Sequence, residues 1–131
     1  MAIVLTSAGK DILTNRVIGL GTEPKWLAIG SGAGTAAIGD TTLFTEYTNG
    51  TWANTPAYAR LFAGGARSTT TVTNDTVGWV DTWTCAAAQT VTNAGSFDAL
   101  TVGNLCVKGD FTGVVLANGD SIQVTIKLQF T

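Results

Sequence analysis

The sequence contains no histidine, and this absence limits the chemistry that the protein can perform. Without histidine, Ser-His-Asp and Cys-His nucleophile arrangements are excluded, and so is the commonest protein ligand for metals. The acidic residues are scattered, and the close pairs, Asp40 with Glu46 and Asp75 with Asp81, are typical of turns and caps. We therefore expect no enzymatic activity, no metal site and no cofactor.

Cysteine is also scarce, because Cys85 and Cys106 are the only two. Two thiols without a histidine cannot form a structural zinc site. Both lie in apolar, strand-like surroundings, which predicts buried free thiols in a protein made in a reducing cytoplasm. A disulfide between adjacent strands is the alternative.

Charged residues make up only 12% of the 131 residues, and the net charge is −2. This share is about half of that in an average soluble domain. Hydrophobic residues account for 45%, with abundant Thr, Ala and Gly. A charge-poor surface of this kind predicts burial against neighbours in an assembly, the alternative being an ordinary uncharged β-domain.

Long apolar runs and basic clusters are missing as well. No stretch approaches the 18 apolar residues that a transmembrane helix needs, so we expect no membrane partner. The opening MAIVLTSAGKDIL lacks the basic and long apolar regions of a signal peptide. The absence of a basic patch argues against nucleic-acid binding.

The pattern that is present predicts mostly β-structure. Residues 1–5 form a short strand, and residues 7–18 form a helix that Thr6 or Ser7 caps and that Gly19 and Gly21 end. Asn118-Gly119 predicts a β-hairpin turn before a strand that alternates strictly from 121 to 130. Further strands are expected at 25–29, 67–74, 76–85, 90–97 and 105–111. These elements predict one domain over residues 1–131, mainly β, an antiparallel β-sandwich or jelly-roll-like fold with one short N-terminal helix.

One predicted strand carries an unusual polar residue. In the alternation of residues 76–85, Asp81 shares a face with Trp79 and Trp83, whose large side chains point to the core. We expect either a partner for the carboxylate or a bulge in the strand.

Residues 26–46, WLAIGSGAGTAAIGDTTLFTE, contain glycines at 30, 32, 34 and 39. The spacing does not fit a dinucleotide fingerprint, because position 35 is Thr, and no lysine follows at P-loop spacing. The stretch therefore predicts a corner with positive φ at several residues, followed by a helical turn at 41–47 that Asp40 or Thr41 caps. Leu43 and Phe44 return the chain to the core.

Residues 47–58 form a turn-rich loop that contains Trp52 and Tyr58. An aromatic residue in such a loop covers the core of its own domain or contacts a neighbouring subunit, and the sequence leaves both alternatives open.

The chain also carries a set of soft motifs. They are LTSAG near the start, PKWLAIGSGAGTAA, DTTLFTE, TTTVTNDT and the closing GDSIQVTIKLQF. Together they resemble a group of small tailed-bacteriophage virion proteins described as capsid decoration (cement) proteins or tail-fibre-like proteins. The resemblance extends over nearly the whole chain and rests on glycines, threonines and alternation rather than on a chemical signature.

The resemblance implies a non-enzymatic structural protein that is made in the host cytoplasm and located on the capsid surface of the virion. The expected partners are the major capsid protein and copies of the chain itself, as a dimer or trimer. The alternative is a small tail, baseplate or tail-fibre component, with receptor or glycan binding through Trp52 and Tyr58. The candidate interaction residues are Ala2, Ile3, Val4, Leu5, Trp52, Tyr58 and Phe62. The first four form an apolar segment that we expect to be free to reach a neighbour, and the 47–62 region shares the contact.

Overall fold

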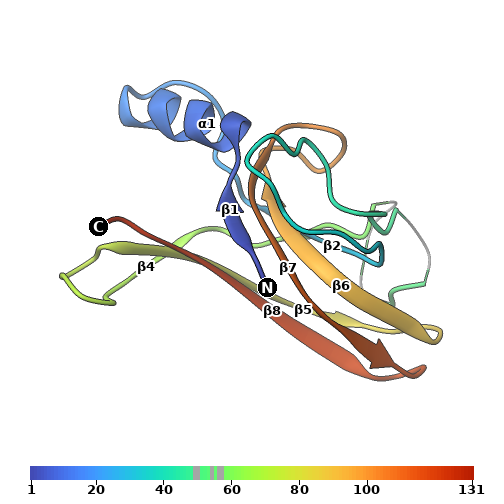
Figure 1. The fold of residues 1–131 in the computed structure, drawn as a ribbon. Helices are drawn as coiled ribbons and strands as arrows, with labels where there is room; N and C mark the ends of the chain where they lie inside the picture. Colours follow the sequence, from blue (N-terminus) through green and yellow to red (C-terminus); the bar gives the residue numbers. More distant parts are fainter. Residues whose placement is uncertain (49–50, 54, 56–57) are drawn as a thin grey trace.

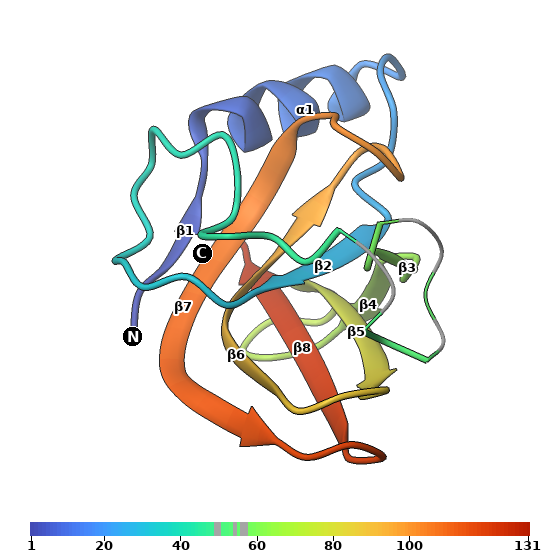
Figure 2. The ribbon, with the colours of Figure 1, turned by 90° about the vertical axis from the view of Figure 1, so that its right-hand side faces the viewer.

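The computed structural model describes residues 1–48, 51–53, 55 and 58–131. Two antiparallel sheets pack face to face, and a helix lies at one end of them (Figures 1 and 2). The five-stranded sheet has the order β1-β7-β6-β2-β3, and the three-stranded sheet has the order β4-β5-β8. The elements are β1 (Ile3–Leu5), α1 (Ser7–Val17), β2 (Trp26–Gly30), β3 (Leu61–Phe62), β4 (Ala66–Ser68), β5 (Thr76–Thr84), β6 (Gln89–Phe97), β7 (Leu105–Leu116) and β8 (Ser121–Gln129). The predicted mainly β, sandwich-like single domain with one short helix is confirmed.

Helix α1 begins where the sequence indicated. The side chain of Thr6 accepts a hydrogen bond of 2.9 Å from the N–H of Gly9, which is N-capping. A Cβ atom on Gly9 would lie 2.1 Å from the carbonyl oxygen of Cys106, so the helix rests directly on β7. Ile12 of the helix is buried and belongs to the core between the sheets.

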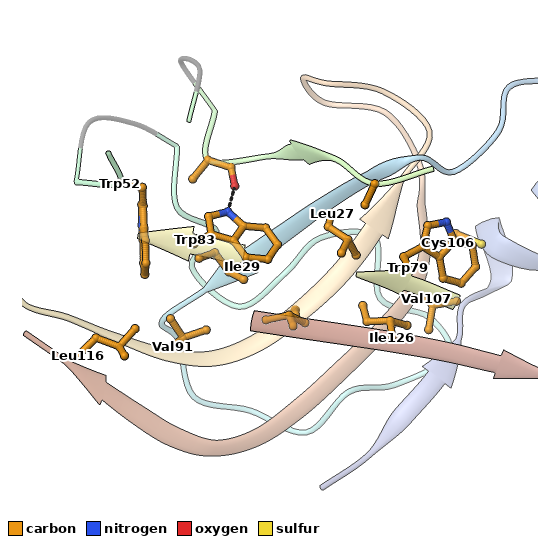
Figure 3. Packing of buried hydrophobic residues seen from close by; sticks show 14 of the residues in the cluster. Leu27, Ile29, Trp52, Trp79, Trp83, Val91, Cys106, Val107, Leu116 and Ile126 are labelled. Atoms are coloured by element: carbon orange, nitrogen blue, oxygen red, sulfur yellow. Dashed lines mark hydrogen bonds between the residues drawn. The ribbon is translucent and has the colours of Figure 1, made fainter. Parts of the chain in front are cut away.

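The core lies between the two sheets and is built around two tryptophans of β5 (Figure 3). Trp79 and Trp83 are 2% and 0% exposed, and they pack with Leu27 and Ile29 of β2. The Nε1 atom of Trp83 donates a hydrogen bond of 2.9 Å to the carbonyl oxygen of Ala59. Aromatic side chains of this size bury the largest apolar area, so the fold depends on this strand.

Strand β5 pairs with β8 in nine consecutive residue pairs, and the predicted alternation of both strands is confirmed. Asp81 lies opposite Val124, in a ladder that continues on both sides. Its Oδ1 atom accepts a 2.8 Å hydrogen bond from the N–H of Thr82, and the side chain is partly exposed. The first of the two expected alternatives therefore holds: the carboxylate has a hydrogen-bond partner, and the strand has no bulge at Asp81.

The prediction of a strand at residues 67–74 is wrong for most of its length, since β4 ends at Ser68. The threonine-rich segment instead folds around the carboxylate of Asp75, which accepts hydrogen bonds from the N–H groups of Thr70, Thr71 and Val72. A side-chain acceptor thus replaces the strand partner that these β-branched residues favour. These hydrogen bonds, with one from Gln129, lower the pKa of Asp75 far below its ordinary value.

The turn at Asn118-Gly119 is present, with φ of 90° at Gly119, but it does not make a β-hairpin. β7 pairs with β1 and β6, whereas β8 pairs with β5, so the turn carries the chain from one sheet to the other. Hydrogen bonds between the turn and Cys85 hold it at the end of β5. Strand β7 also extends past the predicted residue 111 to Leu116, through a shift in its register with β6.

Candidate interaction surface

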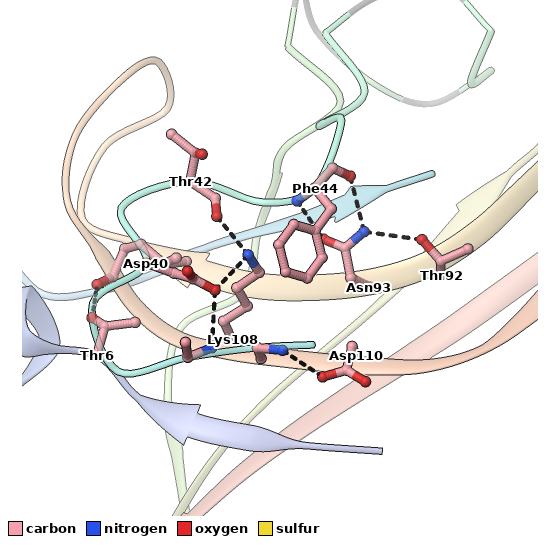
Figure 4. Close-up of polar contacts among 11 residues, drawn as sticks. Thr6, Asp40, Thr42, Phe44, Thr92, Asn93, Lys108 and Asp110 are labelled. Atoms are coloured by element: carbon pink, nitrogen blue, oxygen red, sulfur yellow. Dashed lines mark hydrogen bonds and ion pairs between the residues drawn. The ribbon is translucent and has the colours of Figure 1, made fainter. Parts of the chain in front are cut away.

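Residues 31–46 form a corner that covers the face of the five-stranded sheet turned away from β5 and β8 (Figure 4). Several backbone N–H groups of this corner are paired within the protein. Gly32 donates to Phe44, Ala36 donates to Oδ1 of Asp110, and Ala37 donates to Oδ2 of Asp40. A phosphate cradle needs free, convergent N–H groups, so the geometry fits a structural corner.

The predicted reason for the glycines in this corner is wrong. Gly30, Gly32, Gly34 and Gly39 do not have positive φ. Gly34 is needed instead because an added Cβ would lie 2.6 Å from the ring of Phe44, and Gly30 because one would lie 2.5 Å from the carbonyl oxygen of Phe44. The glycines let the returning chain approach closely.

The predicted helical turn at 41–47 is also absent. The chain turns at Phe44 and Thr45, where Thr45 has φ of 48°, and then runs back along β2. The N–H of Ser31 donates to Thr45, and the N–H of Tyr47 donates to Ile29. Leu43 is buried as expected, while Phe44 is only partly buried. Pairing with the strand provides the backbone hydrogen bonds that a helical turn would have made internally.

A buried lysine fixes the corner to the sheet (Figure 4). Lys108 of β7 is 1% exposed, and its Nζ atom lies 2.8 Å from Oδ2 of Asp40, 2.9 Å from the carbonyl oxygen of Thr42 and 3.2 Å from the centre of the Phe44 ring. The hydrogen bonds from Lys108 and from the Ala37 N–H lower the pKa of Asp40. A charge this deeply buried requires such a complete set of partners.

A second buried cation fixes the other end of the corner. Arg60 is 2% exposed and forms two hydrogen bonds, of 2.6 and 3.1 Å, with the carboxylate of Glu46. It also donates to the carbonyl oxygens of Ala99 and Val102, and its guanidinium lies 3.7 Å from the centre of the Phe97 ring. Asp40 and Glu46 therefore belong to separate ion pairs. Sequence reasoning missed both cations, although a lysine inside the apolar run of β7 was a signal.

The two cysteines are free and buried. Burial raises the pKa of the Cys106 thiol to about 11 and also raises that of Cys85. Neither thiol therefore has the thiolate character of a nucleophile. In the described ranges, no three His, Cys, Asp or Glu side chains gather as a metal site would require. The structure, as far as it is described, has no helix of the length and apolarity that crossing a bilayer requires.

Trp52 belongs to the core, which decides between the two alternatives for this residue of the 47–58 loop. It is 3% exposed, forms a bridge with Cys85 and lies edge-on to Tyr47 with ring centres 5.2 Å apart. Trp52 is thus a lid over its own domain and not a free contact residue. Tyr58 is partly exposed, 5.4 Å from the guanidinium of Arg60. Residues 49–50, 54 and 56–57 of the predicted loop lie outside the described residues.

The N-terminal segment is a strand rather than a free arm. Ile3, Val4 and Leu5 pair with Gly109, Lys108 and Val107 of β7, and the Ala2 carbonyl oxygen accepts from Asp110. Leu5 packs against the core, whereas Ile3, on the same face, is 57% exposed. The expectation that this segment is free to reach a neighbour is therefore wrong, because β7 supplies hydrogen-bond partners for it.

Phe62 lies on β3, at the opposite edge of the five-stranded sheet from β1. It is 60% exposed, with its ring 5.5 Å from that of Trp26 and 5.7 Å from Nζ of Lys25. Phe62 and the N-terminal strand therefore lie at opposite edges of the sheet, and a contact shared between these two regions stays a prediction.

An apolar groove opens between β7 and β8, and sequence reasoning did not anticipate it. Two adjoining hollows of about 90 and 300 Å³ lie along it. Val124 and Phe111 line both hollows, Ile3 and Ile126 line the first, and Val114 lines the second. The groove lies between two strands that follow one another in the chain but belong to different sheets.

No family model and no curated protein matches the chain. A function for the protein is therefore inferred from its sequence and from the structural features described above.

Proposed function

We propose that this protein is a structural component of a tailed-bacteriophage virion, namely a decoration (cement) protein that binds and stabilises the assembled major capsid shell. The observation that carries the proposal is the surface: thirteen large apolar side chains are exposed among the described residues of a chain with 12% charged residues. Single exposed apolar side chains are ordinary, whereas a group of them on one surface is typical of proteins that bury it against partners, and Val17, Ile18 and Leu20 form such a group at the end of α1.

The distribution of these side chains supports several contacts around one particle. Val17, Ile18 and Leu20 are 85%, 65% and 57% exposed at the end of α1, Ile3 lies on β1, and Phe62 lies on β3. A decoration protein that braces neighbouring capsid subunits and touches other copies of itself needs more than one such surface. The resemblance of the glycine, threonine and terminal motifs to virion proteins supports the same proposal.

Cryo-electron microscopy of the particle that carries this protein tests the location. We expect density for the β-sandwich on the outside of the capsid shell. Density on the tail or baseplate, or none in the particle, would overturn the assignment to the capsid.

A binding assay tests one of the surfaces. Phe62→Ala is expected to reduce cosedimentation with capsids that lack the protein, while the melting temperature changes little, because the side chain is largely exposed. Val72→Ala, at a residue 66% exposed in the threonine-rich loop, serves as the matched control and should bind as the unmodified protein does. Equal binding of both variants would exclude Phe62 from the contact.

A further inference from the structure

The three-stranded sheet is too narrow to cover the five-stranded sheet, and the missing cover lies beside β8. Leu5 packs on the core, and Ile3 points to the same side two residues earlier, yet it is 57% exposed. Val114 of β7 is 39% exposed at the far end of the groove. One additional strand next to β8 would lie over this uncovered part of β1 and β7.

The free edge of β8 is also unlike the other sheet edges in the part of the chain that the structure describes. The edge strands β1, β3 and β4 have three, two and three residues, whereas β8 has nine and pairs with β5 along its whole length. Proteins usually protect an edge by keeping it short, bulged or charged. Lys127 is the single charged residue of β8.

The hydrogen-bond pattern shows which backbone groups of β8 point outward. The Cys85 N–H donates to Asp120, and the Phe130 N–H donates to Asp75. Because alternate residues of an antiparallel ladder bond to the same neighbour, the even-numbered residues of β8 bond to β5. The odd-numbered residues direct their N–H and C=O groups to the side on which no strand lies within the described chain: Ser121, Gln123, Thr125, Lys127 and Gln129.

We propose that this edge pairs with β8 of a second copy of the chain, antiparallel and about a two-fold axis at Thr125. The two three-stranded sheets then form one six-stranded sheet in the order β4-β5-β8-β8-β5-β4. In this register all nine residues overlap, with Ser121 opposite Gln129 and Gln123 opposite Lys127. The five outward residues of each copy each donate one backbone hydrogen bond across the axis.

The side chains of β8 fit this partner better than they fit an unrelated strand. The inner residues Ile122, Val124, Ile126 and Leu128 of the two copies would lie beside one another in pairs, on the core side of the joined sheet. On the outer face, the only charge, on Lys127, lies opposite a neutral Gln123 instead of another lysine. The central Thr125 pair is a favourable cross-strand combination.

This inference deepens the self-association included in the proposed function and rests on it. It is tested on the purified protein, so its failure leaves capsid binding to be judged separately. Sedimentation velocity should show a dimer that dissociates on dilution. Hydrogen exchange should be slow at the amides of Gln123, Thr125 and Lys127 in the dimer and fast in the monomer. A monomer at the highest soluble concentration, or a dimer in which these amides exchange rapidly, would overturn the proposal.

Charge variants test the register. Gln123→Lys places two like-charged pairs across the axis and should weaken dimerisation roughly 2- to 30-fold, whereas Gln123→Glu should strengthen it. The double variant Gln123→Lys with Lys127→Glu should restore it. Val80→Lys adds the same charge to the exposed outer face of β5, next to Thr125 but one strand further from the axis. The two copies of this lysine would lie about 14 Å apart, where salt screens their repulsion, so the variant should leave the dimer unchanged. Equal weakening by Val80→Lys and Gln123→Lys would refute this pairing.

Discussion

The ion pair between Lys108 and Asp40 predicts an unequal response to the loss of either partner. Lys108 is 1% exposed, whereas the Asp40 side chain is 23% exposed. Asp40→Asn leaves a buried ammonium without its counter-ion, and such a change typically costs about 3–5 kcal/mol. We expect the lower end, about 3 kcal/mol, because the Thr42 carbonyl oxygen and the Phe44 ring remain beside the ammonium.

The reverse substitution should be milder. Lys108→Met removes the buried charge and keeps an unbranched apolar side chain in the site, so its expected cost is about 1 kcal/mol. Asp40 then keeps its hydrogen bond from Ala37 and its access to water. Unfolding in urea at neutral pH measures both differences. A Lys108→Met variant as unstable as Asp40→Asn would refute the reasoning.

The pH dependence gives an independent test of the same pair. The pKa of Asp40 in the folded state lies below its ordinary value of 3.8, so the carboxylate stabilises the fold at pH values above 3.8. That stabilisation is lost as the pH falls through the folded-state pKa. The difference in unfolding free energy between the unmodified protein and Asp40→Asn should therefore be full at neutral pH and shrink below pH 3.8. A difference that stays constant on acidification would contradict this assignment.

Two further comparisons use matched variants. Gly34→Ala should destabilise by roughly 1–3 kcal/mol, because its Cβ would meet the Phe44 ring at 2.6 Å, while Gly39→Ala, with open space around it, should be nearly neutral in chemical denaturation. Trp83→Phe should cost more than Trp79→Phe, by about 1–3 kcal/mol, because it leaves a buried backbone carbonyl without its donor. The Nε1 atom of Trp79, by contrast, has no hydrogen-bond partner among the described residues, so Trp79→Phe loses no such bond. Melting curves that rank either pair in the reverse order would contradict the packing described here.

Local sequence patterns predicted where the strands lie better than they predicted which strands pair with each other. The alternation of residues 76–85 and 121–130 identified β5 and β8, because strand periodicity is encoded in adjacent residues. The turn at Asn118-Gly119 was also recognised, but its flanking strands belong to different sheets. Periodicity indicates which face of a strand is buried and does not specify which strand lies beside it.

The candidate surface was predicted less well, for the same reason. The exposure of Phe62 agrees with the expectation of a contact residue, whereas Trp52 is core and the N-terminal segment is paired. The glycines of the corner were recognised as a turn, but their role depends on Phe44, which lies ten residues beyond Gly34 and packs on it only in the folded chain. Tertiary contacts of this kind leave no local signature.

The two buried ion pairs bear on how the surface is to be interpreted. The chain has seven basic and nine acidic side chains. Two of each form the ion pairs Arg60–Glu46 and Lys108–Asp40, in which the cations are almost fully buried. Subtraction leaves five basic and seven acidic side chains for the rest of the molecule. The exterior is thus poorer in charge than the composition alone indicates, and the repulsion that normally keeps folded chains apart is weak. With β8 presenting a long edge that carries only Lys127, contact between copies through this edge meets little electrostatic opposition.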